Sequence, residues 1–98
     1  MVRRGRLVVL SVAVGAAVSG REIVVAGGYV EDGSTTARVE LYDPAKRTWR
    51  QGPDLPEPLN HAAAATLKGA AVVVGGYGAG GPTRTAVQLA GDSWRPLP

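Results

Sequence analysis

Cysteine and phenylalanine are absent from this sequence of 98 residues, and histidine occurs once. Without cysteine, the chain has no disulfide framework, no thiolate metal site and no cysteine nucleophile. The single histidine, His61, excludes a zinc site built from several imidazoles. We therefore expect neither a metal site nor a cofactor, and a length of 98 residues allows at most one ordinary domain.

Excess charge is also scarce outside the amino-terminal stretch. The formal net charge of +3 is accounted for by Arg3, Arg4 and Arg6, because the remaining basic and acidic residues balance. A nucleic-acid-binding module would carry a stripe of Lys and Arg across its folded surface. No such stripe is present, so we predict no nucleic-acid partner.

The amino-terminal stretch allows two interpretations. Its three arginines precede a mostly apolar run over residues 7–18, which is too short for a membrane span of about 20 residues. A charged start, an apolar middle and small residues at Ala17 and Ser19 fit a secretory signal peptide over residues 1–19. A Val-rich run also fits a buried strand. The chain would be exported in the first case and cytoplasmic in the second.

An internal repeat organises the rest of the chain. Residues 23–29 (IVVAGGY) resemble residues 72–77 (VVVGGY), and the two Gly-Gly-Tyr triplets are 48 residues apart. At the same offset residues 39–41 (VEL) match residues 87–89 (VQL), whereas Trp49 and Trp94 match at an offset of 45 residues. Several features in one order and at nearly one spacing indicate a repeated supersecondary unit.

Each unit is predicted to contain four short strands joined by turns rich in Gly and Pro. In the first copy we expect strands at residues 12–18, 22–26, 37–42 and 48–51. In the second copy we expect strands at residues 62–67, 70–74 and 84–90, with a short fourth strand centred on Trp94. Residues 77–83 are expected to form a loop. Four short strands every 45 to 50 residues are typical of an antiparallel propeller blade.

Gly27-Gly28 followed by Tyr42 and then Trp49 resembles the kelch repeat, whose period is about 50 residues. The resemblance covers roughly residues 12–98, and the second copy departs from the pattern because Ala90 stands at the expected position of Tyr42. The resemblance implies an all-β fold of antiparallel four-stranded blades from a β-propeller. It also implies structural roles for the motif residues Gly27, Gly28, Tyr42, Trp49, Gly75, Gly76 and Trp94.

Two blades cannot close a ring, since propellers use about four to eight. We assign residues 1–11 to a leader or lead-in, residues 12–56 to a first blade and residues 57–98 to a second, divergent blade. Blades need neighbours to cover their apolar faces. The sequence therefore predicts a fragment of a larger propeller or a chain that completes its ring by self-association.

Long loops on a rigid scaffold are the usual place for binding. In an up-and-down sheet, the loops over residues 29–36, 52–60 and 77–83 lie at one end. The candidate binding residues on this face are polar or aromatic and lean towards acidic, which suits a basic or polar partner; they are Tyr29, Glu31, Asp32, Asp54, Glu57, Asn60, His61, Tyr77 and Arg84.

The family resemblance implies a scaffold that binds protein or carbohydrate, and we assign no catalytic residue. The alternative is a blade pair from a secreted carbohydrate-active enzyme similar to galactose oxidase or to sugar epimerases, with its site on other blades. Residues 76–81 (GYGAGG) formally match the dinucleotide-binding pattern. That chemistry needs a helix after the third glycine, and Pro82 with two β-branched residues argues against one.

Overall fold

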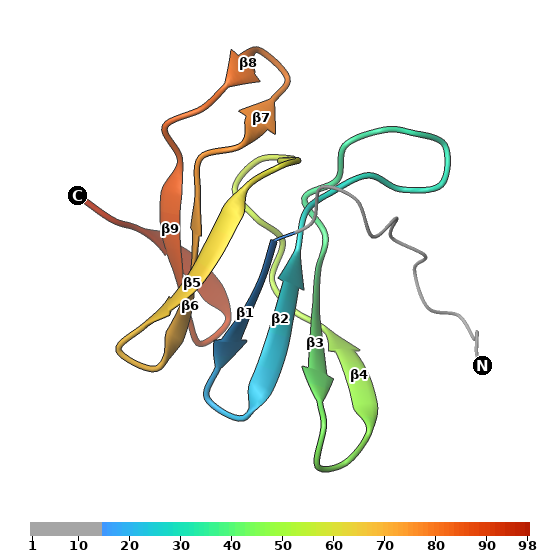
Figure 1. Cartoon of the computed structure of the whole chain (residues 1–98), viewed down its shortest axis with the longest axis vertical. Helices are drawn as coiled ribbons and strands as arrows, with labels where there is room; N and C mark the ends of the chain where they lie inside the picture. Colours follow the sequence, from blue (N-terminus) through green and yellow to red (C-terminus); the bar gives the residue numbers. More distant parts are fainter. Residues whose placement is uncertain (1–14) are drawn as a thin grey trace.

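The computed structural model describes residues 15–98 as two four-stranded antiparallel sheets that lie side by side (Figure 1). Sheet 1 contains, in chain order, β1 (Gly15–Ser19), β2 (Glu22–Ala26), β3 (Val39–Asp43) and β4 (Thr48–Gln51). Every neighbouring pair in this sheet is antiparallel. The all-β prediction is therefore confirmed, and the two sheets do not form a closed ring.

Sheet 2 repeats this arrangement with β5 (Ala63–Leu67), β6 (Ala70–Val74), β9 (Ala86–Ala90) and β10 (Ser93–Pro96). Between β6 and β9, the chain forms a separate two-stranded hairpin from β7 (Tyr77–Gly78) and β8 (Gly81–Pro82). Residues 77–83 were expected to be a plain loop, so this expectation was wrong in detail. The third glycine of the dinucleotide-like pattern belongs to β8 and begins no helix.

Both third strands begin two residues later than the sequence predicts. The carbonyl of Arg38 accepts a hydrogen bond from the N–H of Gly27 at 3.0 Å, and that of Thr85 accepts from Gly75 at 2.7 Å. These bonds tie each chain segment to the glycine after the preceding strand rather than to the regular ladder. Of the predicted strand over residues 12–18, residues 12–14 lie outside the described residues, as do the predicted leader and most of the signal-peptide interpretation.

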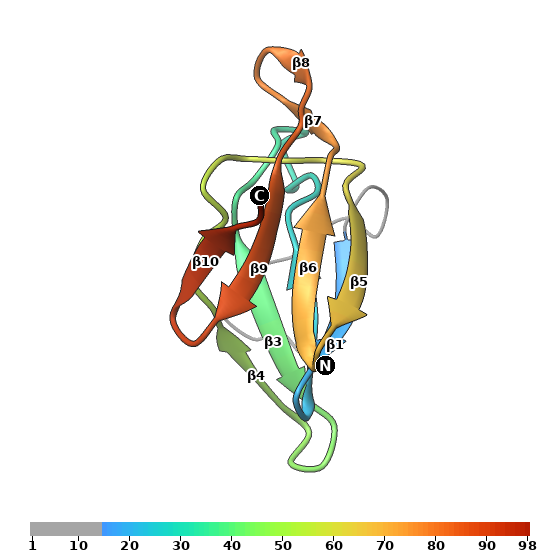
Figure 2. The same ribbon diagram turned by 90° about the vertical axis from the view of Figure 1, so that its left-hand side faces the viewer.

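The two sheets meet through their inner strands, with β1 packed against β5 and β6 (Figure 2). A Cβ added at Gly15 would lie 3.3 Å from the Cβ of Ala64, so the backbones approach closely there. Three hydrogen bonds cross the contact: Thr66 Oγ1 donates to the carbonyl of Val18 at 2.6 Å, the N–H of Ala71 donates to Ser19 Oγ at 3.2 Å, and the N–H of Gly20 donates to the carbonyl of Gly69 at 2.9 Å. The sheets thus pack face to face, as successive blades do.

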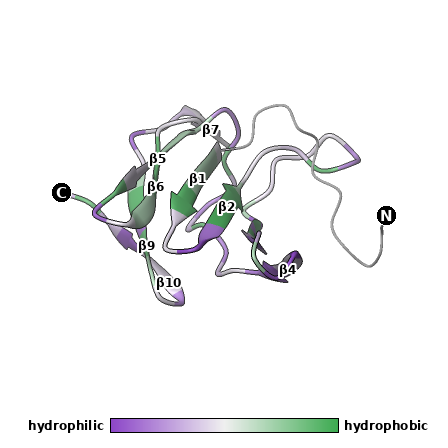
Figure 3. Ribbon diagram, turned by 60° about the horizontal axis from the view of Figure 1, so that its bottom comes forward, coloured by the Kyte–Doolittle hydropathy of each residue, from purple (hydrophilic) through white to green (hydrophobic). Residues whose placement is uncertain are grey.

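The core lies between the sheets and draws on both of them (Figure 3). Its largest fully buried side chains are Leu41, Leu59, Val24, Val39 and Val73, each less than 2 % exposed. Burial of a Val or Leu side chain contributes about 1.5–3 kcal/mol. Trp94 is 9 % exposed, and its Nε1 donates to the carbonyl of Pro53 at 2.8 Å. This bond satisfies the indole N–H that burial removes from water.

The strand pairing corrects one residue equivalence between the two copies. Trp94 lies opposite Leu89, as Trp49 lies opposite Tyr42. Leu89 therefore occupies the position of Tyr42, and the expectation that Ala90 does so was wrong. A shift of one residue turns a side chain to the other face of a sheet. Trp94 faces sheet 1. Trp49 faces away from sheet 2, is 43 % exposed and packs against Tyr42, with ring centroids 4.8 Å apart and an angle of 45° between the rings.

Among residues 15–98, the structure has no apolar helix of the length that a bilayer crossing needs.

Candidate binding face

The long connections lie at one end of the two sheets and the short turns lie at the other (Figure 1). Three segments gather at the long-loop end, over residues 27–38, 52–62 and 75–85. The short turns include Lys68-Gly69, both with positive φ, and the Asp43 turn, in which the carboxylate accepts from the N–H groups of Ala45 and Lys46. The long-loop end is the face that the sequence marks for binding.

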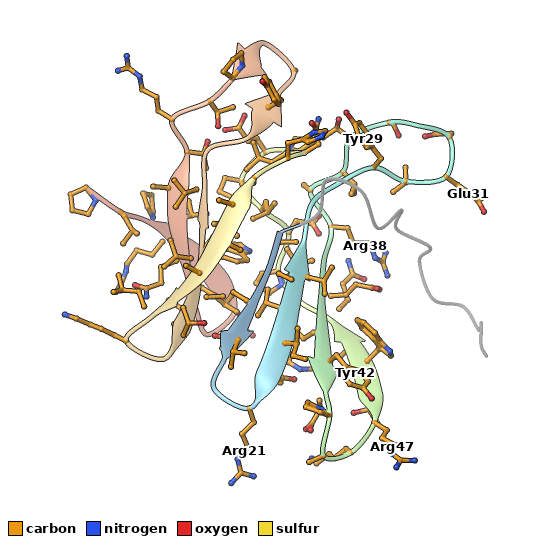
Figure 4. The ribbon with its side chains drawn as sticks, viewed as in Figure 1. Arg21, Tyr29, Glu31, Arg38, Tyr42 and Arg47 are labelled. Atoms are coloured by element: carbon orange, nitrogen blue, oxygen red, sulfur yellow. The ribbon has the colours of Figure 1, made fainter. Side chains whose placement is uncertain are left out.

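The two ends carry different charge. At the short-turn end, Arg21 and Arg47 extend into solvent (Figure 4). The turns at this end also carry the exposed Lys46 and Lys68 and the carboxylates of Asp43 and Asp92. The three segments of the long-loop end carry the carboxylates of Glu31, Asp32, Asp54 and Glu57 and two arginines, Arg84 and Arg38, of which Arg38 is paired with Glu40. The long-loop end is therefore the more acidic end of the molecule.

The centre of the long-loop end is a cluster of three rings. The exposed His61 ring lies between Tyr29 and Tyr77, with ring centroids 6.1 Å from each and interplanar angles of 78° and 83°. These edge-to-face arrangements are favourable for aromatic pairs. Tyr29 lies in the β2–β3 connection of sheet 1 and Tyr77 lies in β7, in the β6–β9 connection of sheet 2, so His61 joins the loops of both sheets. We name these three residues the Tyr–His–Tyr cluster.

Asn60 anchors this cluster from below. It is 7 % exposed, its N–H donates to the carbonyl of Tyr77 at 3.0 Å, and the N–H of Tyr77 donates back at 2.8 Å. Its Nδ2 donates to Thr35 Oγ1 at 2.9 Å, and its Oδ1 lies 2.8 Å from His61 Nδ1. With Oδ1 as acceptor, Nδ1 carries the imidazole proton and Nε2 is left as an acceptor in the neutral ring. Asn60 thus connects all three loops, through its side-chain amide to Thr35 and His61 and through its backbone to Tyr77.

Two glycines allow this close approach. A Cβ at Gly27 would collide with the carbonyl of Leu59, and a Cβ at Gly76 would lie 2.8 Å from the carbonyl of Asn60. Both glycines have positive φ, 72° and 86°. Gly27 and Gly76 therefore each meet two requirements: they adopt a left-handed backbone conformation, and they leave space for the loop that holds His61.

Glu57 lies beside the cluster and is held in place by Thr85. Thr85 Oγ1 donates to Glu57 Oε2 at 2.7 Å, and a Cβ added at Gly78 would lie 2.8 Å from Glu57 Oε1. The carboxylate is therefore fixed between the loop over residues 52–62 and the β7–β8 hairpin. It adds a preorganised negative charge to the rim of the face.

The other candidates lie at the periphery. Asp32 accepts hydrogen bonds from the N–H and the hydroxyl of Ser34, at 2.9 and 2.6 Å, and these bonds lower its pKa below the usual 3.8. Glu31 is exposed at the tip of the same loop, away from Tyr29 (Figure 4). Asp54 and Arg84 are exposed as well. Within residues 15–98, no hydrogen bond or ion pair links Glu31, Asp54 or Arg84 to the Tyr–His–Tyr cluster.

The sequence analysis missed two residues that position this face, Thr35 and Thr85. Each donates or accepts through a hydroxyl to a candidate residue on another loop. Their signal in the sequence is weak, because hydroxyl residues are common in loops and their partners are 25 and 28 residues away. Residues 15–98 contain no group of three or more His, Cys, Asp and Glu side chains arranged to hold a metal ion.

Comparison with known proteins places part of the chain in a family. Residues 11–56 match the family model described as the Kelch motif. This segment comprises all of sheet 1 and the start of the following loop, and it includes Gly27, Gly28, Tyr42 and Trp49, on which the resemblance was based. No curated protein matches the chain.

Proposed function

We propose that this chain, whose residues 11–56 match the Kelch motif, is a kelch-repeat binding scaffold whose long-loop end takes a protein segment rich in Lys or Arg. The family match supports a kelch-repeat scaffold of the kind generally implicated in protein binding. The finer part of the proposal, the site and its partner, rests on the Tyr–His–Tyr cluster and on the charge around it.

The Tyr–His–Tyr cluster is the observation that carries the proposal. Tyr77 is 49 % exposed although its backbone is held by two hydrogen bonds to Asn60. A fixed backbone with an exposed aromatic ring loses little conformational entropy on binding. Aromatic side chains of this kind are enriched at protein interfaces because one part is apolar and the hydroxyl is polar.

The surrounding charge selects the kind of segment. Lys or Arg over a tyrosine face gains about 0.5–2 kcal/mol from the cation–π interaction. The Glu57 carboxylate, fixed by Thr85, and the loop carboxylates of Asp32 and Asp54 add attraction for the same cations. Charge complementarity of this kind raises the association rate and disfavours acidic partners.

The proposal assigns no catalytic role to the chain and treats residues 12–56 and 57–98 as two blades of the scaffold. Further blades in the same chain or in other copies would complete the propeller. A carbohydrate ligand would use the same two tyrosine rings without needing the carboxylates, so it is the outcome that the test below distinguishes.

The test measures binding of immobilised peptides by biolayer interferometry with the full chain. Three peptides of equal length carry Lys and Arg, Gln, or Glu at the same positions. We expect the basic peptide to bind best, with affinity that falls as salt is raised. Tyr77→Ser should weaken binding by about tenfold, which corresponds to the loss of one aromatic contact.

Ala45→Ser is the control, because Ala45 is exposed, carries no charge and lies in the Asp43 turn at the short-turn end of the molecule. It should bind the basic peptide as the unchanged chain does. Equal binding of all three peptides, or equal loss in both variants, would contradict the proposed site. Binding of a neutral oligosaccharide that Tyr77→Ser abolishes would favour a carbohydrate ligand instead.

A further inference from the structure

Five of the six large apolar side chains exposed among residues 15–98 lie on two sheet faces that point in opposite directions. Side chains alternate along a strand, and Gly15 and Val24 face sheet 2. The outward set on the free face of sheet 1 is Val18, Ile23 and Trp49; by the same alternation from Ala64, the set on the free face of sheet 2 is Leu67 and Val74. Tyr77 is the sixth.

The repeat relates these two free faces to the contact inside the chain. The pairing of β5 with β6 reproduces that of β1 with β2 at an offset of 48 residues. Val18 is thus the equivalent of Thr66, and Ile23 is the equivalent of Ala71. In the same way Leu67 is the equivalent of Ser19. The free face of sheet 1 corresponds to the face of sheet 2 that packs on sheet 1.

The internal contact shows what these equivalent positions touch. Thr66 donates its hydroxyl to the carbonyl of Val18, and the N–H of Ala71 donates to Ser19 Oγ. Positions 66 and 71 of one sheet therefore meet positions 18 and 19 of the other through two polar contacts. The same docking between two copies would place Val18 and Ile23 of one copy against Leu67 of the next.

At two of these positions a hydroxyl side chain has an apolar equivalent, since Thr66 corresponds to Val18 and Ser19 to Leu67, and Ala71 corresponds to the larger Ile23. Val18, Ile23 and Leu67 are 51, 37 and 48 % exposed in the isolated chain. Docking would bury all three against one another, and each buried methylene contributes about 0.8 kcal/mol. Apolar side chains that face one another across a shared docking geometry indicate complementary surfaces.

At a second pair of positions, the side chains are apolar in the contact inside the chain and polar on both free faces. Leu41 and Val87 are both buried in the core between the sheets. Strand pairing makes Gln88 the equivalent of Leu41 and Glu40 the equivalent of Val87. An apolar pair inside the chain thus corresponds to an amide and a carboxylate on the free faces. Gln88 Nε2 already donates to the carbonyl of Leu67 at 2.8 Å, and Glu40 already accepts from Arg38 at 3.3 Å. This pair is therefore polar on both free faces, and the apolar set of Val18, Ile23 and Leu67 carries the complementarity.

We propose that copies of this chain associate head to tail, with the free face of sheet 1 of one copy on the free face of sheet 2 of the next. The occupant is a second copy rather than an unrelated partner, because the two free faces match each other at the positions the internal contact specifies. A head-to-tail contact is heterologous and gives a ring when its rotation closes. This association leaves the long-loop end uncovered and does not depend on what binds there.

The test is the mass in solution of the full chain and of two charge variants, measured by size-exclusion chromatography with light scattering. Val18→Lys alters the free face of sheet 1, and Leu67→Glu alters that of sheet 2. We expect the unchanged chain to be a discrete oligomer at micromolar concentration, and each variant alone to associate at least about tenfold more weakly, since a charge is then buried against apolar surface. An equal mixture of the variants should associate again, because it retains one unaltered pair of faces.

Tyr77→Ser is the control and should keep the mass of the unchanged chain. Leu67→Ser, which adds no charge, should weaken association in the same direction as Leu67→Glu. A monomeric mass for the unchanged chain overturns the proposal, whatever its circular dichroism spectrum. The proposal also fails if only one charge variant dissociates, because that result indicates an isologous contact. It fails as well if the mixture stays monomeric while both variants give the circular dichroism spectrum of the unchanged chain.

Discussion

Gly75 and Gly76 are adjacent glycines that share a left-handed backbone conformation, but only Gly76 is closely packed. Substitutions at the two positions can therefore distinguish the cost of backbone strain from the cost of a steric clash. Both have positive φ, 71° and 86°. A Cβ at Gly75 would meet nothing within 4 Å, whereas a Cβ at Gly76 would lie 2.8 Å from the carbonyl of Asn60 and 3.0 Å from the Cα of Ala62. Replacing each by alanine therefore adds the same methyl group to one open and one crowded position.

The expected losses follow from these distances. A Cβ in a left-handed conformation costs about 1–2 kcal/mol, and both variants share this term. Gly76→Ala must also push backbone atoms aside, which costs about 1–3 kcal/mol more. The displaced segment carries the paired hydrogen bonds between Asn60 and Tyr77, each worth about 1 kcal/mol. Gly76→Ala should thus be the less stable variant by about 1–3 kcal/mol.

Urea denaturation followed by tryptophan fluorescence measures this difference, with both variants at one protein concentration. For a denaturant slope of about 1–3 kcal/mol per molar in urea, the midpoint of Gly76→Ala should lie roughly 1 M below that of Gly75→Ala. A variant at position 76 that fails to fold while Gly75→Ala folds agrees with the same reasoning. Coincident midpoints, or a lower midpoint for Gly75→Ala, would refute the close approach of these loops.

Three further outcomes follow from the structure. Arg50 donates two hydrogen bonds to Glu22, at 2.9 and 2.8 Å, and lowers the pKa of Glu22 below 4.5. Because the Arg50 side chain is 59 % exposed, Glu22→Gln should lower the free energy of unfolding by at most about 1 kcal/mol. The loss of stability should be greatest above pH 4.5, the usual pKa of Glu, and should vanish as the pH falls through the lowered pKa of Glu22. A difference in urea midpoints between the variant and the unchanged chain that grows in acid would contradict this prediction. Thr85→Val removes the donor to Glu57 and should cost about 1–2 kcal/mol in the same urea assay; no change would show that the bond is dispensable. Deletion of residues 1–19 removes β1, which pairs along all of β2, and should abolish cooperative unfolding; a sharp transition in the deleted chain would favour the signal peptide.

The strands were predictable because their pattern is local. Val-rich runs located β2 and β6, and the repeat, with its two tryptophans and its Gly and Pro turns, located the cores of the other six strands of the two sheets. The hairpin β7–β8 could not be predicted, since Tyr77–Gly78 and Gly81–Pro82 contain almost no strand-forming residues. Its pairing depends on tertiary contacts, including the hydrogen bonds between Tyr77 and Asn60.

The residue equivalence in the third strands was misjudged because the local match between residues 39–41 and 87–89 is one residue out of register with the pairing. Val74 pairs with Ala86 as Ala26 pairs with Val39, so the segment between the second and third strands is one residue shorter in the second copy. Letters alone cannot show this, since Val-x-Leu fits either register. The consequence is large, because the shift exchanges the faces to which these side chains point.

The candidate face could be predicted only as a set of loops. The up-and-down order of the strands predicted that the loops with Tyr29, His61 and Tyr77 lie at one end. The contacts between their rings depend on the positive φ of His61, 55°, and on the hydrogen bonds that Asn60 makes. A left-handed histidine is uncommon and has no sequence signature. Glu31, Asp54 and Arg84 shared the end of the molecule without joining the cluster, because they occupy exposed loop positions.

His61 gives the most direct test of the proposed binding face, because it is the one histidine in the sequence and its ring protons are therefore a unique probe. Two-dimensional proton NMR of the full chain should show contacts from these protons to the rings of two tyrosines. Addition of the Lys- and Arg-rich peptide should shift the His61 resonances, and the Glu-containing peptide should leave them unchanged. Ring protons without tyrosine contacts, or resonances that no basic peptide moves, would contradict the Tyr–His–Tyr cluster as the proposed binding face.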